Sequence, residues 1–153
     1  MDHNNILPVV LAGGKSKRFG EDKSQTQLGS KILIDYILSE IINDFNEVII
    51  VANDPIKHLS SNKIVTIEDY KKDLGPLGGI FSAMKWVKNN NKKYQWIITF
   101  PSDTPFFKNK IMDSFLNKIN TKESELFFMK SNEKRHNIFG LWSLDLIDQL
   151  EKD

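Results

Sequence analysis

The 153-residue sequence contains no cysteine, only three histidines and almost no net charge. The absence of cysteine excludes disulfides, thiolate metal sites and cysteine nucleophiles together, and it fits a reducing compartment, so we expect a cytoplasmic protein. Lys and Arg number 21 against 20 Asp and Glu, which leaves a formal charge of +1 and does not indicate a broad basic surface for nucleic acid. Any anion-binding site must therefore be local.

Long apolar runs are also missing. No stretch approaches the ~20 apolar residues of a membrane span. The apolar residues 6–12 are too short for the hydrophobic region of a signal peptide followed by a cleavage site. We therefore expect no membrane association and no leader. A chain of this length forms one domain, residues 1–153, and buries roughly two thirds of the surface that its unfolded form exposes.

Apolar runs rich in β-branched residues alternate with stretches of helical periodicity. The runs predicted to be strands are residues 6–11, 47–51, 64–67, 96–100 and 126–129. The stretches predicted to be helices are residues 33–41, 77–87, 111–119 and the tail 144–153. Such alternation predicts an α/β fold with right-handed crossovers and a mainly parallel sheet.

Polar residues or glycines follow four of the predicted strands. These pairs are Gly13-Gly14, Asn53-Asp54, Glu68-Asp69 and Ser102-Asp103. In open parallel sheets, ligands bind beyond the carboxyl ends of the strands. We therefore expect these residues to lie along one edge of the sheet and to form the binding site.

The segment after the first predicted strand, residues 11–23, combines three glycines with four basic residues. Glycine allows backbone N–H groups to approach a phosphate chain, and basic side chains neutralise it. A basic surface loop would have the same composition. A Walker A loop ending at residues 14–16 would need glycine where Val9 stands, and no G-x-G-x-x-G pattern can be written here. The segment is therefore neither of these two phosphate loops.

Four blocks of residues occur in a characteristic order. They are Leu11-Ala12-Gly13-Gly14 followed by Arg18, Gly20 and Asp22-Lys23; Asp73-Leu74-Gly75-Pro76-Leu77-Gly78-Gly79-Ile80; Pro101-Ser102-Asp103-Thr104-Pro105-Phe106; and residues 136–142. Together they resemble the molybdenum cofactor guanylyltransferase family, with Asn137 in place of a proline in the last block. Cytidylyltransferases of isoprenoid synthesis usually show Leu-Ala-Ala-Gly and Pro-Lys instead. The resemblance runs from about Ile6 to Trp142.

The resemblance implies both a fold and an activity. The fold is a Rossmann-like three-layer sandwich of the nucleotide-diphospho-sugar transferase type. The activity is Mg²⁺-dependent transfer of GMP from GTP to the molybdenum-molybdopterin cofactor, with release of pyrophosphate. The implied partners are GTP, a molybdopterin-type acceptor and molybdoenzyme-maturation proteins. The chain itself is expected to be a monomer or a weak homo-oligomer.

The resemblance also implies roles for individual positions. Backbone atoms of the first loop would contact the nucleotide, at Leu11, Ala12, Gly13 and Gly14. Lys23 would contact its phosphates, and Asn53 and Asp69 would complete the nucleoside pocket. Asp103 would contact the nucleotide and bind Mg²⁺, which prefers a few carboxylates together with phosphate oxygens and water. The implied catalytic residues are Arg18, Lys23 and Asp103.

Structural roles compete with these assignments. Asn53 and Asp103 precede Asp54-Pro55 and Thr104-Pro105, where Asn and Asp are ordinary turn formers. Residues 75–79 would make a tight turn that opens a helix at Pro76, and the same helix N-terminus would suit an anionic ligand. His136 would either contact the acceptor or serve the fold.

Two alternative functions stay open. One is a cytidylyl- or other nucleotidyltransferase of the same superfamily, and the other is a nucleotide-binding homologue without turnover. The second arises because the resemblance implies a missing C-terminal segment, with a late Asn-x-Asn-Thr strand; Asn120-Thr121 is not that motif, since position 118 is Lys. We therefore expect binding of Mg²⁺ and GTP, poor transfer of GMP, and an exposed apolar patch that favours self-association.

Overall fold

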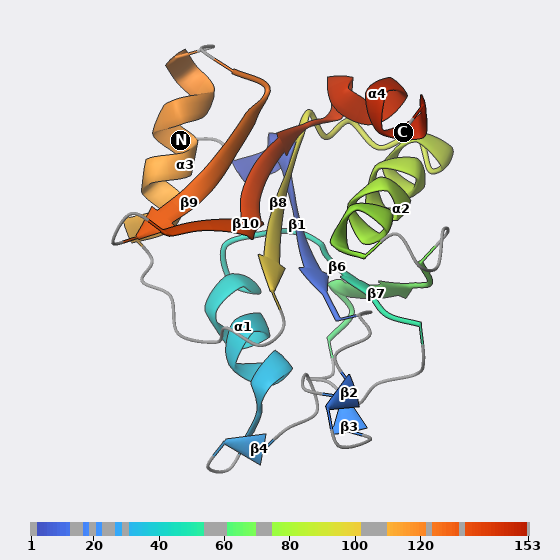
Figure 1. Cartoon of the computed structure of the whole chain (residues 1–153), viewed down its shortest axis with the longest axis vertical. Helices are drawn as coiled ribbons and strands as arrows, with labels where there is room; N and C mark the ends of the chain where they lie inside the picture. Colours follow the sequence, from blue (N-terminus) through green and yellow to red (C-terminus); the bar gives the residue numbers. More distant parts are fainter. Residues whose placement is uncertain are drawn as a thin grey trace.

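The computed structural model contains a six-stranded sheet in the order β7-β6-β1-β8-β10-β9, with helices on both sides (Figure 1). It describes residues 3–12, 17–18, 21–22, 27–28, 31–53, 61–69, 75–101, 110–121, 124–131 and 134–152. The strands of the sheet are β1 (Ile6–Leu11), β6 (Val48–Val51), β7 (Ile64–Ile67), β8 (Trp96–Pro101), β9 (Leu126–Ser131) and β10 (Lys134–Ser143). Two-residue strands form two small pairs, β2 (Lys17–Arg18) with β3 (Glu21–Asp22), and β4 (Gln27–Leu28) with β5 (Lys31–Ile32).

The helices confirm the predicted alternation. The longer ones are α1 (Leu33–Ile41), α2 (Pro76–Asn89) and α3 (Lys110–Thr121). The described residues also include two short 3₁₀ turns, η1 (His3–Asn5) and η3 (Leu144–Leu146), and helix α4 (Ile147–Lys152). The tail was predicted as one helix from 144, which is wrong in detail. Its first turn is 3₁₀, as is common at helix ends, and the Ser143 side chain caps it by accepting a hydrogen bond from the Asp145 N–H at 3.2 Å.

The sheet is mainly parallel, as predicted. Strands β7, β6, β1 and β8 run parallel, while β10 lies antiparallel to both β8 and β9. Strand β10 was not predicted, although residues 136–142 were recognised as a block. Its first residues are polar, and its register against β9 shifts between His136 and Gly140, so the strand lacks a regular alternation.

Side chains of the sheet alternate between two apolar layers, which makes the fold a three-layer sandwich. On one face, Val10, Ile50 and Phe100 pack with residues of α1 and α3. On the other face, Leu7, Ile49 and Ile97 pack with α2, η3 and α4. Trp96, Phe127 and Phe128 pack against these layers as core aromatics, and Trp142 is buried among them. These four aromatic residues therefore belong to the core.

Proline lies in the centre of the sheet, at Pro8 of β1. The Ala12 N–H donates to the Val51 carbonyl of β6. Because backbone groups alternate in direction along a strand, the N–H and C=O positions of Val10 and Pro8 also face β6. The β1–β6 pairing begins only at Val9 opposite Ile49. The missing N–H of Pro8 therefore coincides with the start of the ladder and interrupts nothing.

Glu47 anchors the loop that leads into β8. The Tyr94 hydroxyl donates to Glu47 Oε1 at 2.7 Å, and Lys92 Nζ lies 3.2 Å from Glu47 Oε2. Burial and the bond to Glu47 raise the pKa of Tyr94 far above its ordinary value. The phenol therefore remains a neutral donor throughout the neutral pH range.

Surface apolar groups are few in the part of the chain that the structure describes. Leu77 is the large hydrophobic residue that is exposed there, at 49%. The expected apolar patch stays a prediction, since several other apolar side chains, such as Leu146 and Leu150, are only partly buried. Within the same described ranges, no helix is both long and apolar enough to cross a membrane.

The Thr99 hydroxyl joins β8 to β10 in the core. Its oxygen accepts from the Gly140 N–H at 3.2 Å and from Trp142 Nε1 at 3.1 Å, and it donates to the Gly140 carbonyl at 3.3 Å. Thr99 is fully buried. A Cβ at Gly140 would lie 2.9 Å from the Phe127 carbonyl oxygen, so only glycine allows this close approach of β9 and β10.

Replacing Thr99 by valine should destabilise the fold by about 2–4 kcal/mol, because two buried N–H groups lose their acceptor while the side-chain shape is kept. Urea denaturation measures the change in unfolding free energy. The matched control is Thr66→Val on the exposed side of β7, which should change stability by less than about 0.5 kcal/mol. A Thr99→Val loss no larger than that of the control would contradict the role of this hydroxyl.

Candidate functional site at the carboxyl edge of the sheet

The carboxyl ends of the four parallel strands stand on one row. Leu11 pairs with Val51 and with Pro101, and Val51 pairs with Ile67. The ladder continues one residue further, because Ala12 N–H donates to the Val51 carbonyl at 2.8 Å and Ala52 N–H to the Ile67 carbonyl at 3.0 Å. Residues that follow these strands therefore leave the sheet from a common edge, as the sequence predicted.

Four of the residues with implied binding roles are described at this edge. Leu11 is half-buried and Ala12 is buried at the end of β1. Asn53, after β6, is exposed, while Asp69, after β7, is 7% exposed. The structure therefore brings an exposed amide and a buried carboxylate to the same edge as the end of β1.

The other site predictions are only partly described. Gly13, Gly14, Lys23 and Asp103 lie outside the described residues. Arg18 lies in β2, where it pairs with Glu21 of β3. This small hairpin lies on the side of the sheet toward which β1 and β8 point (Figure 1). His136 lies in β10 opposite Met129, so its block is a strand of the sheet.

Helix α2 begins beside the end of β1. Its N-cap residue, Gly75, has φ 62° and ψ −149°, a backbone conformation that only glycine adopts readily, and Pro76 follows at the first helical position. A Cβ at Gly79 would lie 2.9 Å from Leu11 Cδ2 and 3.5 Å from Val51 Cγ1. The glycines of residues 75–79 therefore start the helix and let it pack directly on the ends of β1 and β6, which confirms the predicted turn at Pro76.

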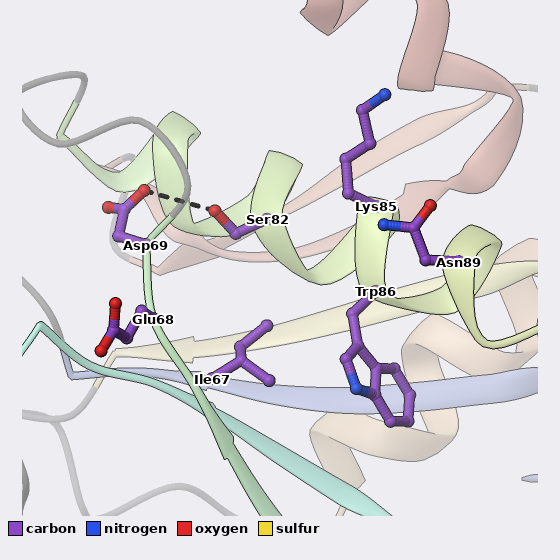
Figure 2. A pocket seen from close by; sticks show the side chains of 7 residues that line it. All are labelled: Ile67, Glu68, Asp69, Ser82, Lys85, Trp86 and Asn89. Atoms are coloured by element: carbon purple, nitrogen blue, oxygen red, sulfur yellow. Dashed lines mark hydrogen bonds between the residues drawn. The ribbon is translucent and has the colours of Figure 1, made fainter.

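A hollow of about 480 Å³ lies between β7 and α2 (Figure 2). Its lining residues are Ile67, Glu68, Asp69, Ser82, Lys85, Trp86 and Asn89. The Ser82 hydroxyl donates to Asp69 Oδ1 at 3.3 Å, and Figure 2 shows this bond at one end of the hollow. Lys85 reaches instead toward α4, with its Nζ 3.3 Å from Glu151 Oε1.

The sequence analysis did not single out Ser82 or the other α2 residues of this hollow. In the sequence, Ser82 is the one polar residue in the apolar run Ile80-Phe81-Ser82-Ala83-Met84. In the structure, every residue of this run is buried. A buried hydroxyl in a helix requires a partner. The apolar run therefore indicates that Ser82 needs a hydrogen-bond partner, but it does not identify Asp69 as that partner.

The described ranges contain few side chains that could bind a metal ion together. There, no three His, Asp or Glu side chains gather into a group that could hold an ion. The carboxylate with an implied metal role, Asp103, follows Pro101 by two positions in the sequence, and Pro101 ends β8 on the common row. An oxygen donor at this position fits a hard divalent cation.

A mainly parallel sheet whose parallel strands end on one row, covered on both faces by helices, is a Rossmann-like three-layer sandwich, as the sequence predicted. Residues 8–153 match the family model of the MobA-like NTP transferase domain. The chain belongs to this family.

Relatives in the family carry a specific name. The chain is 30% identical over 149 residues to the probable molybdenum cofactor guanylyltransferase of Halalkalibacterium halodurans, covering 93% of this chain and 72% of that protein. It is 29% identical over 147 residues to the molybdenum cofactor guanylyltransferase of Haemophilus influenzae, covering 95% of this chain and 74% of the relative. The chain thus spans about three quarters of each.

Solved structures agree on the fold. Molybdopterin-guanine dinucleotide biosynthesis protein A from Archaeoglobus fulgidus superposes with a TM-score of 0.72 at 20% identity, over 95% of this chain and 71% of that one. The 2-C-methyl-D-erythritol 4-phosphate cytidylyltransferase of Francisella tularensis gives 0.70 at 13% identity, over 97% and 77%. A Mycobacterium tuberculosis protein in complex with manganese gives 0.68 at 14% identity, over 97% and 76%. At these identities the likeness concerns the fold alone.

Replacing Gly75 by alanine should lower stability by about 1–3 kcal/mol, because alanine is strained at this φ and ψ although no atom of the described residues lies within 4 Å of its Cβ. Thermal and urea unfolding measure the loss. Pro76→Ala is the control, since alanine is compatible with the first turn of a helix and should cost less. Equal stability of Gly75→Ala and the unchanged protein would show that the backbone at this position relaxes without cost.

Proposed function

We propose that this chain is a cytoplasmic nucleotidyltransferase domain, spanning residues 1–153, that transfers GMP from GTP to the molybdenum-molybdopterin cofactor and releases pyrophosphate. One observation carries the proposal: the register of the sheet brings the end of β1, Asn53 and Asp69 to a single edge in a chain of the MobA-like family. The names of its relatives, molybdenum cofactor guanylyltransferases, supply the nucleotide and the acceptor.

The nucleotide half of the site follows from the strand ends. The backbone of Leu11, Ala12, Gly13 and Gly14 would contact the nucleotide, and Asn53 with Asp69 would complete the nucleoside pocket. The exposure of Asn53 supports contact with a ligand that enters from solvent. The buried Asp69 carboxylate would accept hydrogen bonds from nucleoside N–H or O–H groups in surroundings that weaken competition from water.

The chemistry requires positioning more than proton transfer. A phosphate monoester of the acceptor attacks the α-phosphorus of GTP in line, and pyrophosphate leaves. The second pKa of a phosphate monoester is about 6. The attacking phosphate is therefore already ionised at neutral pH and needs no general base. The chain must align the two ligands and stabilise the charge that develops on the phosphates. Lys23, Arg18 and the amides of the first loop would do so.

A divalent cation completes the charge balance of this site. Asp103 would hold it as Mg²⁺, since a carboxylate is the donor type that this ion prefers. A bound Mg²⁺ supplies a positive charge that neutralises phosphate oxygens. The manganese complex of a protein with the same fold supports a divalent ion in this type of domain.

The test is a turnover assay with GTP, Mg²⁺ and a molybdopterin acceptor, in which released pyrophosphate is measured. We expect slow release with GTP and less still with CTP or ATP, because a wrong base leaves buried polar groups unpaired. Preference for CTP would favour the cytidylyltransferase alternative. Calorimetric binding of GTP without any pyrophosphate release would favour the nucleotide-binding homologue. Capture of molybdoenzyme-maturation proteins would extend the proposal to its implied protein partners.

Replacing Asp103 by asparagine should lower pyrophosphate release at least about a hundredfold, because the neutral amide keeps the shape but loses the charge that holds the cation. The melting temperature should stay within about 2 °C, since the change is isosteric. The control is Asp148→Asn on the exposed face of α4, which should retain full turnover. Normal turnover and normal Mg²⁺ dependence in Asp103→Asn would remove Asp103 from the site.

A further inference from the structure

The hydroxyl of Ser82 lies between two acceptors. One is the Gly78 carbonyl of the preceding turn of α2, at 2.8 Å, and the other is Asp69 Oδ1, at 3.3 Å. The first bond is the ordinary back-bond of a serine in a helix. The second joins α2 to the residue that follows β7, thirteen positions earlier in the chain. Because a hydroxyl has one hydrogen, the longer bond to Asp69 shares that hydrogen with the bond to Gly78 or alternates with it.

Both side chains are buried, Ser82 at 4% and Asp69 at 7% exposure. They line the same end of the hollow between β7 and α2, and Figure 2 shows the second carboxylate oxygen of Asp69 directed away from Ser82. The terminal torsion of an aspartate is broad and roughly two-fold, so the side chain alone does not fix the plane of its carboxylate. A hydrogen bond to one oxygen restricts that plane.

The packing of α2 fixes the position of Ser82. Gly78, Gly79 and Ile80 are buried, and Gly79 packs against Leu11 and Val51 at the ends of β1 and β6. Ser82 is therefore positioned relative to the same strand ends that start the proposed nucleotide loop. A shift of α2 would move Ser82, and with it the oxygen of Asp69 that it contacts.

We propose that Ser82 is a positioning residue, whose hydroxyl orients the Asp69 carboxylate for the nucleoside half of the nucleotide. The inference rests on the proposed role of Asp69 in the nucleoside pocket. Ser82 does not touch the ligand; it fixes one oxygen of Asp69 before the ligand arrives, so that binding does not have to order the carboxylate. Ser82 therefore contributes to the affinity for the nucleoside part of the ligand and not to the affinity for its triphosphate.

The experiment measures, by calorimetry in Mg²⁺, the affinities of Ser82→Ala for GTP and for inorganic tripolyphosphate. We expect GTP to bind about five- to thirtyfold more weakly, and tripolyphosphate to bind within about twofold of the unchanged protein. The matched control is Ser39→Ala in α1. Ser39 makes the same back-bond, to the Asp35 carbonyl at 2.7 Å, on the opposite face of the sheet, and its loss should change neither affinity.

Asp69→Asn and the double variant complete the test. If Ser82 acts through Asp69, Ser82→Ala should weaken GTP binding much less in the Asp69→Asn background than in the unchanged protein. Unaltered GTP affinity in Ser82→Ala, or equal losses for GTP and tripolyphosphate, would overturn the positioning role while leaving the proposed function intact. Unaltered GTP affinity in Asp69→Asn would instead overturn the nucleoside role of Asp69, and the inference with it. A wild-type chain that binds no GTP would overturn the proposed function itself.

Discussion

The register of the four parallel strands is the constraint on which the rest of the structure depends. Because Leu11, Val51, Ile67 and Pro101 stand on one row, every segment that follows a parallel strand starts at the same height. Hydrogen bonds set this row, and apolar layers on both faces hold it. A slip of one residue in any strand would exchange its two buried faces and move its last residue off the row. The packing of the core therefore determines where the residues of the proposed site lie.

Helix α2 packs on the ends of these strands and positions the residues beside them. Its start needs a glycine for the backbone at Gly75 and another for close packing at Gly79, for two different reasons. Once the helix lies on the ends of β1 and β6, its first two turns face the end of β7. Ser82 then meets Asp69, although the two residues belong to different elements. Packing of a glycine-rich turn thereby determines the surroundings of a carboxylate.

The predictable parts of the molecule were those with local signals. Runs such as residues 64–67 are β-branched and appear as strands with the predicted bounds, and the common edge followed from the order of strands and helices. Strand β10 was missed because polar residues and Gly140 hide its alternation. The Ser82–Asp69 contact was missed because it depends on how α2 sits against β7, which no local pattern encodes. The roles of Lys23 and Asp103 rest on the family resemblance alone.

The order of strands in space departs from their order in the chain at two places: β8 lies beside β1, and β10 lies between β8 and β9. The second departure has a consequence for biosynthesis. Strand β9 precedes β10 in the sequence, yet β9 joins the sheet through β10, which lies between it and β8. As the chain leaves the ribosome, the parallel strands can pair in sequence, whereas β9 must wait for the next segment to emerge. Until then, β8 presents a temporary open edge. The Thr99 hydroxyl finds its partners on Gly140 and Trp142, more than forty residues later, when β10 closes that edge.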